Sequence, residues 1–450
     1  MEYYDLSVPI QRTNRIPLET KTVFSSKEEL DAYLASKTST AYPGQYVSVS
    51  NDTKTTPYVI TAALKAVEIT PDLQLWLAQI KEEYATRIVN EFGIMEAGGT
   101  HGVEYKCLVF GGRKIAVVNS VGAAIDTDII IVDKLHGYPV EELYGFTDSK
   151  ITSIIIPDSC YYIGDEAFKG CTDLTNIRFP ENDNFNTIFD FSFQGCTALS
   201  TVNLPPSVID IRNSAFQDCT NLVSISLANI QNFGTRSFMN CLGITENILL
   251  NNSSINFGAE AFRNCKGITK VELTDMSSVM LWGSVFTGCT SLNEVIIESG
   301  NIMEKDGNQF NDCTSLTSIT LGVIPRNSFE GTFGIPEYFC YGCSSLSNVS
   351  LPSDISGWIV RAYAFAQSGL PTITLKGVHT IKEKAFSQCT NLSSIKLGKS
   401  LQVIEAGALE GCSNLTDIYY EGTETEWNII SIADNNECFT NSTIHFECEI

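Results

Sequence analysis

The sequence predicts a solenoid of α/β class that leans to mainly β, with parallel strands in about 11 coils of about 23–25 residues. The main observation is a phrase that recurs along the chain. It consists of an apolar residue, then Cys and Leu or Ile at three-residue steps, then Ile or Val and a final apolar residue. One copy comprises Phe168, Cys171, Leu174, Ile177 and Phe179. A period of this length indicates stacked coils, because a single coil cannot bury its own apolar face.

The end of each phrase predicts a strand, because apolar and polar residues alternate there. Ile225 and Leu227 flank Ser226, so the two apolar side chains are expected to face the core and the serine to face solvent. The chain then returns through segments such as 211–216, whose Ile and Phe are expected to enter the same core. The sequence thus predicts one short strand per coil, paired in parallel with its neighbours.

Cysteine marks the same position in ten coils, and Ser368 takes this position in another. These cysteines are Cys171, Cys196, Cys219, Cys241, Cys265, Cys289, Cys313, Cys343, Cys389 and Cys412. We expect them to be buried free thiols, because a small apolar side chain packs well there and stacked side chains do not point at one another. Cys107, Cys160, Cys340, Cys438 and Cys448 lie outside this register, and a disulfide between Cys438 and Cys448 remains an open alternative.

The phrase is preceded by segments such as Tyr162-Ile163-Gly164-Asp165-Glu166-Ala167-Phe168, and together they closely resemble the BspA-like leucine-rich repeats of bacterial surface and adhesion proteins. The resemblance implies a right-handed leucine-rich-repeat solenoid over residues 147–418. Segments 125–131 and 137–140 resemble the lead-in β segment of such arrays, which implies an N-terminal β cap over 102–146. Segment 419–427 resembles their closing segment, so residues 419–450 are expected to form the C-terminal cap.

Residues 1–70 contain no repeat phrase and are predicted to form a separate small α+β module. A capping signal predicts a helix over 25–34, and alternation predicts strands at 45–50 and 57–60 around a turn. Three segments, 9–19, 23–26 and 41–45, resemble the N-terminal module of tail and appendage proteins of gut bacteriophages. This resemblance implies a docking module that contacts other virion proteins.

Residues 71–101 are predicted to form a helix followed by a glycine-rich hinge. Thr70 and Pro71 are a favourable helix start, and apolar residues from Leu73 to Ile88 recur at three- and four-residue steps. Such a stripe is typical of a helix packed on its own protein. The alternative is a short trimeric coiled-coil neck, which would make the protein a homotrimer.

Composition and motifs argue against several classes of function. The net charge of −23 opposes binding to nucleic acid or to an anionic membrane, and no run of eighteen apolar residues predicts membrane insertion. The first nine residues do not resemble a secretory signal peptide. Segment 93–100 lacks the lysine of a phosphate loop, and the four histidines are scattered. We therefore predict no catalytic, metal-binding or cofactor-binding residues, and no cofactor.

The candidates for partner binding are residues that depart from the period or line the strands. The coil between Cys313 and Cys343 is overlong, and its insertion within Gly322–Tyr338 is expected to form a binding loop. The candidates in this loop are Phe329, Phe333 and Tyr338, and Trp282 and Trp358 are added because both are expected to be partly exposed. Arg178, Asn203, Glu272 and Lys396 represent the polar strand face, which is equally compatible with an ordinary solvated surface.

Two functions fit these observations. In the first, the chain is a non-enzymatic virion protein of a phage tail or appendage. Its N-terminal module docks to the particle, and its repeats attach to a host cell-surface protein or glycan. In the alternative, it is a BspA-like bacterial cell-surface adhesin whose export signal is missing from this sequence. The lack of a recognisable signal peptide favours the virion, because lysis releases such a protein without secretion.

Overall fold

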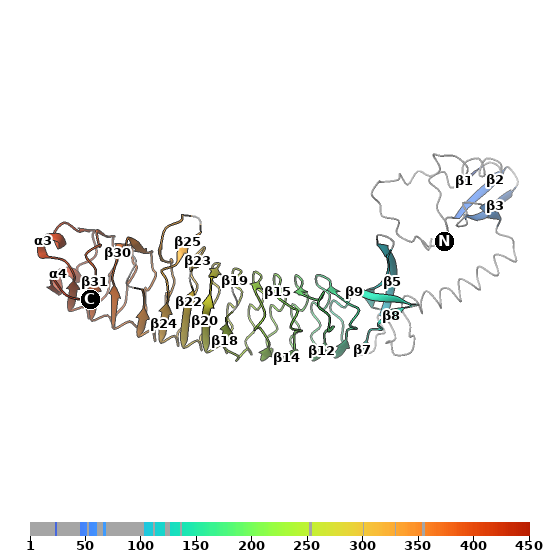
Figure 1. Cartoon of the computed structure of the whole chain (residues 1–450), viewed down its shortest axis with the longest axis horizontal. Coiled ribbons are helices and arrows are strands. Elements are labelled where there is room, and N and C mark those ends of the chain that lie inside the picture. Colours follow the sequence, from blue (N-terminus) through green and yellow to red (C-terminus); the bar gives the residue numbers. More distant parts are fainter. Residues whose placement is uncertain are drawn as a thin grey trace. The chain divides into compact units, whose positions relative to one another are not determined.

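The computed structural model describes residues 23–24, 46–51, 54–60, 66–68, 103–110, 113–121, 127–135, 137–251, 254–299, 301–328, 330–352 and 356–450. The chain divides into two compact units. The first contains residues 1–126 and 130–142, and the second contains residues 127–129 and 143–450. Figure 1 shows the second unit as a regular stack of coils.

The first unit begins with a small sheet. Its strands are β1 (Val23–Phe24), β2 (Tyr46–Asn51), β3 (Lys54–Ile60) and β4 (Ala66–Glu68), which lie side by side in sequence order. The antiparallel pairing of β2 with β3 confirms the two strands predicted around the turn at 51–53. The helices predicted at 25–34 and within 71–101 lie outside the described residues, as do the hinge and the trimeric neck.

The same unit contains two further hairpins. Strands β5 (Val103–Phe110) and β6 (Arg113–Val121) pair in antiparallel fashion, as do β8 (Lys134–Leu135) and β9 (Tyr138–Leu143). The side chains of Val103, Ala116 and Val118 are fully buried, so one face of the first hairpin is covered. All four strands fall within the segment predicted as the N-terminal β cap.

The strand at the end of each phrase forms the first ladder of the second unit, here named the repeat-strand ladder. Its strands are β7 (Asp128–Ile130), β10 (Ser153–Ile155), β12 (Asn176–Arg178), β14 (Thr201–Val202), β16 (Ser224–Ile225), β18 (Ile248–Leu250), β20 (Lys270–Met276), β22 (Glu294–Ser299), β24 (Ser318–Leu321), β27 (Asn348–Ser350), β29 (Thr372–Leu375), β31 (Ser394–Leu397), β33 (Asp417–Tyr420) and β35 (Thr443–His445). The pairing is parallel, for example between Val295 and Ile319. Ile225 and Leu227 are buried and Ser226 is exposed, which confirms the predicted alternation.

The segments in which the chain returns form a second parallel ladder, here named the return ladder. Its strands are β13 (Thr187–Ile188), β15 (Asp210–Ile211), β17 (Asn232–Phe233), β19 (Ser254–Phe257), β21 (Ser278–Leu281), β23 (Ile302–Glu304), β25 (Arg326–Asn327), β26 (Gly334–Ile335), β28 (Trp358–Val360), β30 (Val378–Ile381), β32 (Val403–Ile404) and β34 (Ser431–Ile432). The first return strand, β11 (Tyr162–Ile163), is not hydrogen-bonded to β13. The prediction of one strand per coil is therefore wrong. The return strands are only two to four residues long, too short for alternation to reveal them.

The solenoid has about 14 turns rather than the predicted 11. The ladder continues where the phrase is no longer recognisable. At its C-terminal end, Cys438 directs its thiol at the Leu409 carbonyl, and Ile444 pairs with Ile418. Cys438 therefore occupies the repeat position, contrary to the prediction. This coil is not recognisable in the sequence because Asn441 occupies the position where other coils have Leu or Ile.

A column of phenylalanine rings runs through the core between the two ladders. From Phe146 to Phe310, successive rings stack with their centres 5.1 to 5.6 Å apart. Phe339 then meets Phe310 edge to face at 5.3 Å, and the column resumes from Phe365. The burial of these large rings is the main term that holds neighbouring coils together.

The repeat cysteines are free and buried, as predicted. Each of the ten thiols donates a hydrogen bond to a main-chain carbonyl of the preceding coil, at 2.9 to 3.2 Å. Burial raises the pKa of Cys219 and of Cys289 to about 12, so both remain protonated at neutral pH. Cys438 and Cys448 are also free, which excludes the disulfide that the sequence left open.

The closing segment contains two short helices and the last two strands. Helix α3 (Glu424–Trp427) starts with a capping box between Thr423 and Glu426, and α4 (Cys438–Asn441) precedes β35. Trp427 is buried between Tyr420 and Phe439, with ring centres 5.2 and 5.8 Å away. An aromatic cluster thus covers the core at this end of the ladder.

Candidate binding surfaces

The four predicted residues of the polar strand face all lie along the solvent side of the repeat-strand ladder, but they do not form one site. Arg178 and Asn203 are exposed, and Glu272 and Lys396 are half-exposed in coils farther along the chain. Arg178 donates hydrogen bonds to the Ile156 carbonyl and to Asp158, at 3.1 and 3.0 Å. Glu272 forms an ion pair with Lys270 at 2.8 Å. Arg178 and Glu272 therefore already have partners within the chain.

The two predicted tryptophans differ in exposure. Trp282 is half-exposed, its indole nitrogen donates to Asn256 at 3.1 Å, and the Lys305 ammonium lies 4.2 Å from its ring centre. Trp358 is completely buried, and its indole nitrogen donates to the Lys376 carbonyl at 3.0 Å. The prediction that Trp358 is partly exposed is therefore wrong, because this residue lies on the inward side of β28.

The insertion in the overlong coil forms a hairpin, here named the insertion hairpin (residues 326–334). Strand β25 pairs with β23, whereas β26 pairs with β28, and a single antiparallel bridge joins Arg326 to Phe333. The hairpin therefore ends one part of the return ladder and starts the next. Phe333 is 44% exposed, with the Arg326 guanidinium 5.9 Å from its ring centre, while Phe329 lies outside the described residues.

Ionic and polar contacts hold the insertion hairpin in place. Arg361, on the neighbouring coil, donates to Glu330 at 2.8 Å and to Thr332 at 2.6 Å. This contact lowers the pKa of Glu330. At the base of the hairpin, the Asn327 amide donates to the buried carboxylate of Glu304 at 2.9 Å. The hairpin is therefore held by two hydrogen bonds from the Arg361 guanidinium and by the buried hydrogen bond between Asn327 and Glu304.

Next to the hairpin is a group of three half-exposed rings, here named the tyrosine cluster (Tyr338, Tyr341 and Tyr363). Tyr338 and Tyr363 stack with centres 4.8 Å apart and an angle of 4° between planes, and Tyr341 lies 5.7 Å from Tyr338. Gln367 donates to the Tyr341 hydroxyl at 2.7 Å, and the Lys384 ammonium lies 5.8 Å from the Tyr363 ring centre. The insertion thus places Tyr338 beside two tyrosines that the sequence analysis did not identify.

The main chain at Tyr338 and Tyr363 has a left-handed conformation, with φ of 51° and 56°. The residue five positions before the repeat cysteine has this conformation in every coil from Glu166 to Gly407. Because the turn demands it everywhere, the strain itself is not a functional signal. These two coils differ from the others because both have a tyrosine at this position. Counting five residues back from Cys343 and from Ser368 in the sequence identifies both tyrosines.

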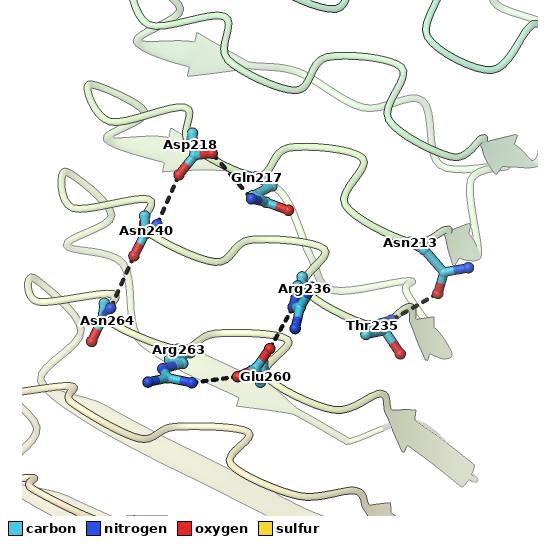
Figure 2. A network of polar contacts seen from close by, with 9 residues as sticks. All are labelled: Asn213, Gln217, Asp218, Thr235, Arg236, Asn240, Glu260, Arg263 and Asn264. Carbon is cyan, nitrogen blue, oxygen red and sulfur yellow. Dashed lines mark hydrogen bonds and ion pairs between the residues drawn. The ribbon is translucent and has the colours of Figure 1, made fainter.

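A polar network lies along the coils around residues 213–264, and its contacts join residues of this chain to one another. Figure 2 shows a chain in which the Asn264 amide donates to Asn240 and the Asn240 amide donates to the Asp218 carboxylate. The two distances are 2.9 and 2.8 Å. Figure 2 also shows Glu260 between Arg236 and Arg263; burial raises the pKa of this carboxyl, but the two arginines outweigh burial and lower it. The contacts of Asn240 with Asp218, of Asn264 with Asn240 and of Arg236 with Glu260 cross between coils, so the network stabilises the stack.

The described parts of the chain contain neither a cluster of metal ligands nor a helix that could span a membrane. Among those residues, no three His, Cys, Asp or Glu side chains gather closely enough to hold a metal ion. No helix in that same part is long and apolar enough to cross a bilayer.

Comparisons with known proteins agree with this geometry. The family described as "BspA type Leucine rich repeat region (6 copies)" matches residues 142–269, 231–335 and 333–446, which together exceed half of the chain. Among solved structures, a leucine-rich repeat protein from Bacteroides ovatus is 22% identical with a TM-score of 0.47, over 78% of this chain and 99% of that chain. No curated protein matches the chain.

Two further solved structures are similar to this chain. The pneumococcal vaccine antigen PcpA is 18% identical with a TM-score of 0.42, over 79% of this chain and all of that chain (100%). A leucine rich cell surface protein from Faecalibacterium prausnitzii is 18% identical with a TM-score of 0.35, over 75% of this chain and 98% of that chain.

Proposed function

Because the chain belongs to the BspA-type leucine-rich repeat family, we propose that it is a non-enzymatic binding protein that attaches to a host cell-surface protein or glycan. Its attachment surface comprises the insertion hairpin and the tyrosine cluster. The observation that carries this proposal is the tyrosine cluster, which collects three half-exposed rings on adjacent coils beside the largest break in the repeat.

The chemistry of this surface suits binding. Tyrosine combines a large apolar ring with a hydroxyl that donates and accepts hydrogen bonds, and it loses little conformational entropy when it binds. Stacking between Tyr338 and Tyr363 holds both rings in place before any partner arrives. The ammonium of Lys384 and the amide of Gln367 add polar groups at the edge. Aromatic rings that are already ordered before a partner binds are typical of the residues that contribute most to the binding energy of an interface.

Membership of this family favours a bacterial cell-surface adhesin. The second candidate is the phage virion protein, and the observation that favours it is the resemblance of segments 9–19, 23–26 and 41–45 to phage tail and appendage modules. In that case residues 1–70 would dock to other virion proteins, and the same attachment surface would contact the host. Immunogold electron microscopy of purified phage particles and of bacterial cells, with one antibody against the solenoid, separates the two placements.

The attachment surface is tested with a double variant, Tyr338→Ser with Tyr363→Ser, in a cell-binding assay that uses the labelled full chain. We expect at least a tenfold loss of binding, because both stacked rings are removed. The matched control is Phe191→Ser, since Phe191 occupies the same left-handed position in another coil and also has a lysine, Lys169, over its ring at 5.3 Å. Thermal melts confirm that the variants remain folded.

The control variant is expected to bind like the unmodified protein. Equal losses in the control and the double variant would show that the left-handed position five residues before the repeat cysteine matters for folding and not for attachment. Unchanged binding by the double variant would overturn the proposal for this surface.

A further inference from the structure

The coil that starts at Phe238 contains one residue more than its neighbours between the repeat cysteine and the strand. Cys241 is followed by the buried strand residue Ile248 seven positions later, whereas the spacing from Cys219 to Ile225 and from Cys265 to Val271 is six. Strand β18 pairs with β20 in normal register, with Ile248 opposite Val271. Strands β16 and β18 are not hydrogen-bonded neighbours, so the repeat-strand ladder is interrupted beside the extra residue.

A surface groove of about 210 Å³ opens at this interruption. Leu227, Ile248 and Leu249 contribute apolar walls, and Glu246 and Asn247 contribute polar groups. Leu249 is 54% exposed, unlike Ile225 and Ile248 beside it, which face the core. The groove therefore combines an open apolar surface with a carboxylate at one place.

The carboxylate of Glu246 bridges the interruption. It accepts hydrogen bonds from the Ser224 hydroxyl and from the main-chain nitrogen of Ile225, both on β16. Among the described residues, no lysine or arginine forms an ion pair with Glu246. A carboxylate oxygen accepts more than one hydrogen bond, so Glu246 retains capacity for a cationic partner.

The surroundings of the groove are acidic. Glu272 lies opposite Leu249 on the neighbouring strand, and Glu294 is one strand farther. Lys270, on the same strand as Glu272, is held between these two carboxylates at 2.8 and 2.9 Å. The potential of this surface is negative and attracts basic groups, as does the net charge of −23 on the whole chain.

We propose that this groove binds an arginine side chain from a basic segment of a partner protein. The methylene groups of arginine match the apolar walls formed by Leu227 and Leu249, and the guanidinium matches the carboxylate of Glu246. This site lies on the repeat-strand ladder and does not depend on the attachment surface proposed above.

The test uses the full chain and two short peptides, acetyl-Gly-Arg-Gly-amide and its citrulline analogue, in a ligand-observed NMR titration. Citrulline has nearly the shape of arginine without its charge. We expect the arginine peptide to bind about two- to fivefold more tightly, the size of one solvent-accessible charge pair. Glu246→Gln should remove this difference, and Leu249→Ser should weaken both peptides. Deletion of Asn247 restores the six-residue spacing, so it should close the groove and abolish binding.

Two controls separate this site from general attraction. Glu298→Gln removes a carboxylate on the same ladder, and Leu242→Ser removes another exposed leucine, but neither residue lines the groove. Both variants should bind the arginine peptide like the unmodified protein. Equal binding of the two peptides, or an equal effect of Glu298→Gln and Glu246→Gln, would overturn the proposal.

Discussion

The thiol of Cys219 illustrates why one small side chain recurs at the same position of the coil. It is fully buried and donates a hydrogen bond to the carbonyl of Phe193 on the preceding coil, at 3.1 Å. Alanine would fill the space but leave that carbonyl without this donor. Serine keeps a donor, and Ser368 occupies the position in another coil, within hydrogen-bonding distance of Cys389 at 3.4 Å. The residues found at this position are therefore small, and each has a polar hydrogen.

Two substitutions of Cys219 are expected to differ strongly. Cys219→Asp should lower the free energy of unfolding by more than about 3 kcal/mol, because it buries a charge without a partner. Cys219→Ser should lower it by only about 1 kcal/mol, because the hydroxyl can still donate to the carbonyl. Urea unfolding followed by circular dichroism measures both values. Similar costs for the two variants would show that the carbonyl contact contributes little.

One coil exchanges two core residues that other coils keep in a fixed order. Ala364 and Phe365 are a typical pair, but the preceding coil has Phe339 at the alanine position and Cys340 at the phenylalanine position. The main-chain bonds from Phe310 to Phe339 and from Cys340 to Ala364 keep the usual register. The ring thus reaches the core from the adjacent position, which explains the edge-to-face contacts that interrupt the column there.

This exchange predicts a compensating pair of substitutions. Phe339→Ala should cost about 3–5 kcal/mol, because it leaves a cavity in the column. Adding Cys340→Phe to that variant restores the order of the neighbouring coils, and we expect it to recover more than half of the loss. Urea unfolding of the single and double variants provides the comparison. A double variant that is less stable than Phe339→Ala would show that the coil cannot accept the ring at the usual position.

At the scale of the element, the insertion hairpin depends on a buried carboxyl at its base. Burial raises the pKa of Glu304, so the folded protein keeps this proton to higher pH than the unfolded chain does. The free energy of unfolding should therefore fall as the pH rises from the unfolded pKa of about 4.3 to the higher folded pKa.

Glu304→Gln should remove this dependence, because its amide oxygen can still accept the hydrogen bond from Asn327. Relative to the unmodified protein, the variant should gain thermal stability near pH 7 and gain none near pH 4. The control Glu330→Gln should behave in the opposite way, since Arg361 lowers the pKa of Glu330 and the stability linked to that carboxylate is lost as the pH falls. Melting temperatures across the pH range test both signs.

The sequence predicted those elements whose pattern is long enough to be seen. The repeat-strand ladder and the ten buried cysteines follow from a phrase with five fixed positions. The return strands, the last coil around Cys438 and the burial of Trp358 do not, because each depends on pairing with a neighbouring coil. Of the candidate site, the overlong coil was visible and Phe333 is exposed, but Tyr341 lies outside the insertion of that coil and Tyr363 lies in the next coil. The shared position of Tyr338 and Tyr363 can be counted from the repeat cysteine, but the contacts among the three rings depend on how the coils stack.

At the scale of the whole molecule, the solenoid requires its end to be covered. Deletion of the residues after Asp417 removes Ile418, Tyr420 and the cluster around Trp427, all of which are buried. The preceding coil would then expose its apolar face, and we expect aggregation and a lower melting temperature. Removal of Glu449 and Ile450 alone is the control and should change neither property. Light scattering and thermal melts distinguish a true cap from a dispensable tail.

The division of the return ladder between β25 and β26 has a mechanical consequence. The repeat-strand ladder is also interrupted nearby, between β27 and β29, so neither ladder runs continuously past this region. In a stack of parallel strands, hydrogen bonds between neighbours share an applied load, and coils joined by fewer of these bonds are expected to yield first. A pulling force on the two ends of the solenoid is therefore expected to extend it in two steps, with the first rupture between residues 326 and 372. Under load, the solenoid would therefore lengthen between residues 326 and 372 before its attachment surface dissociates from a partner.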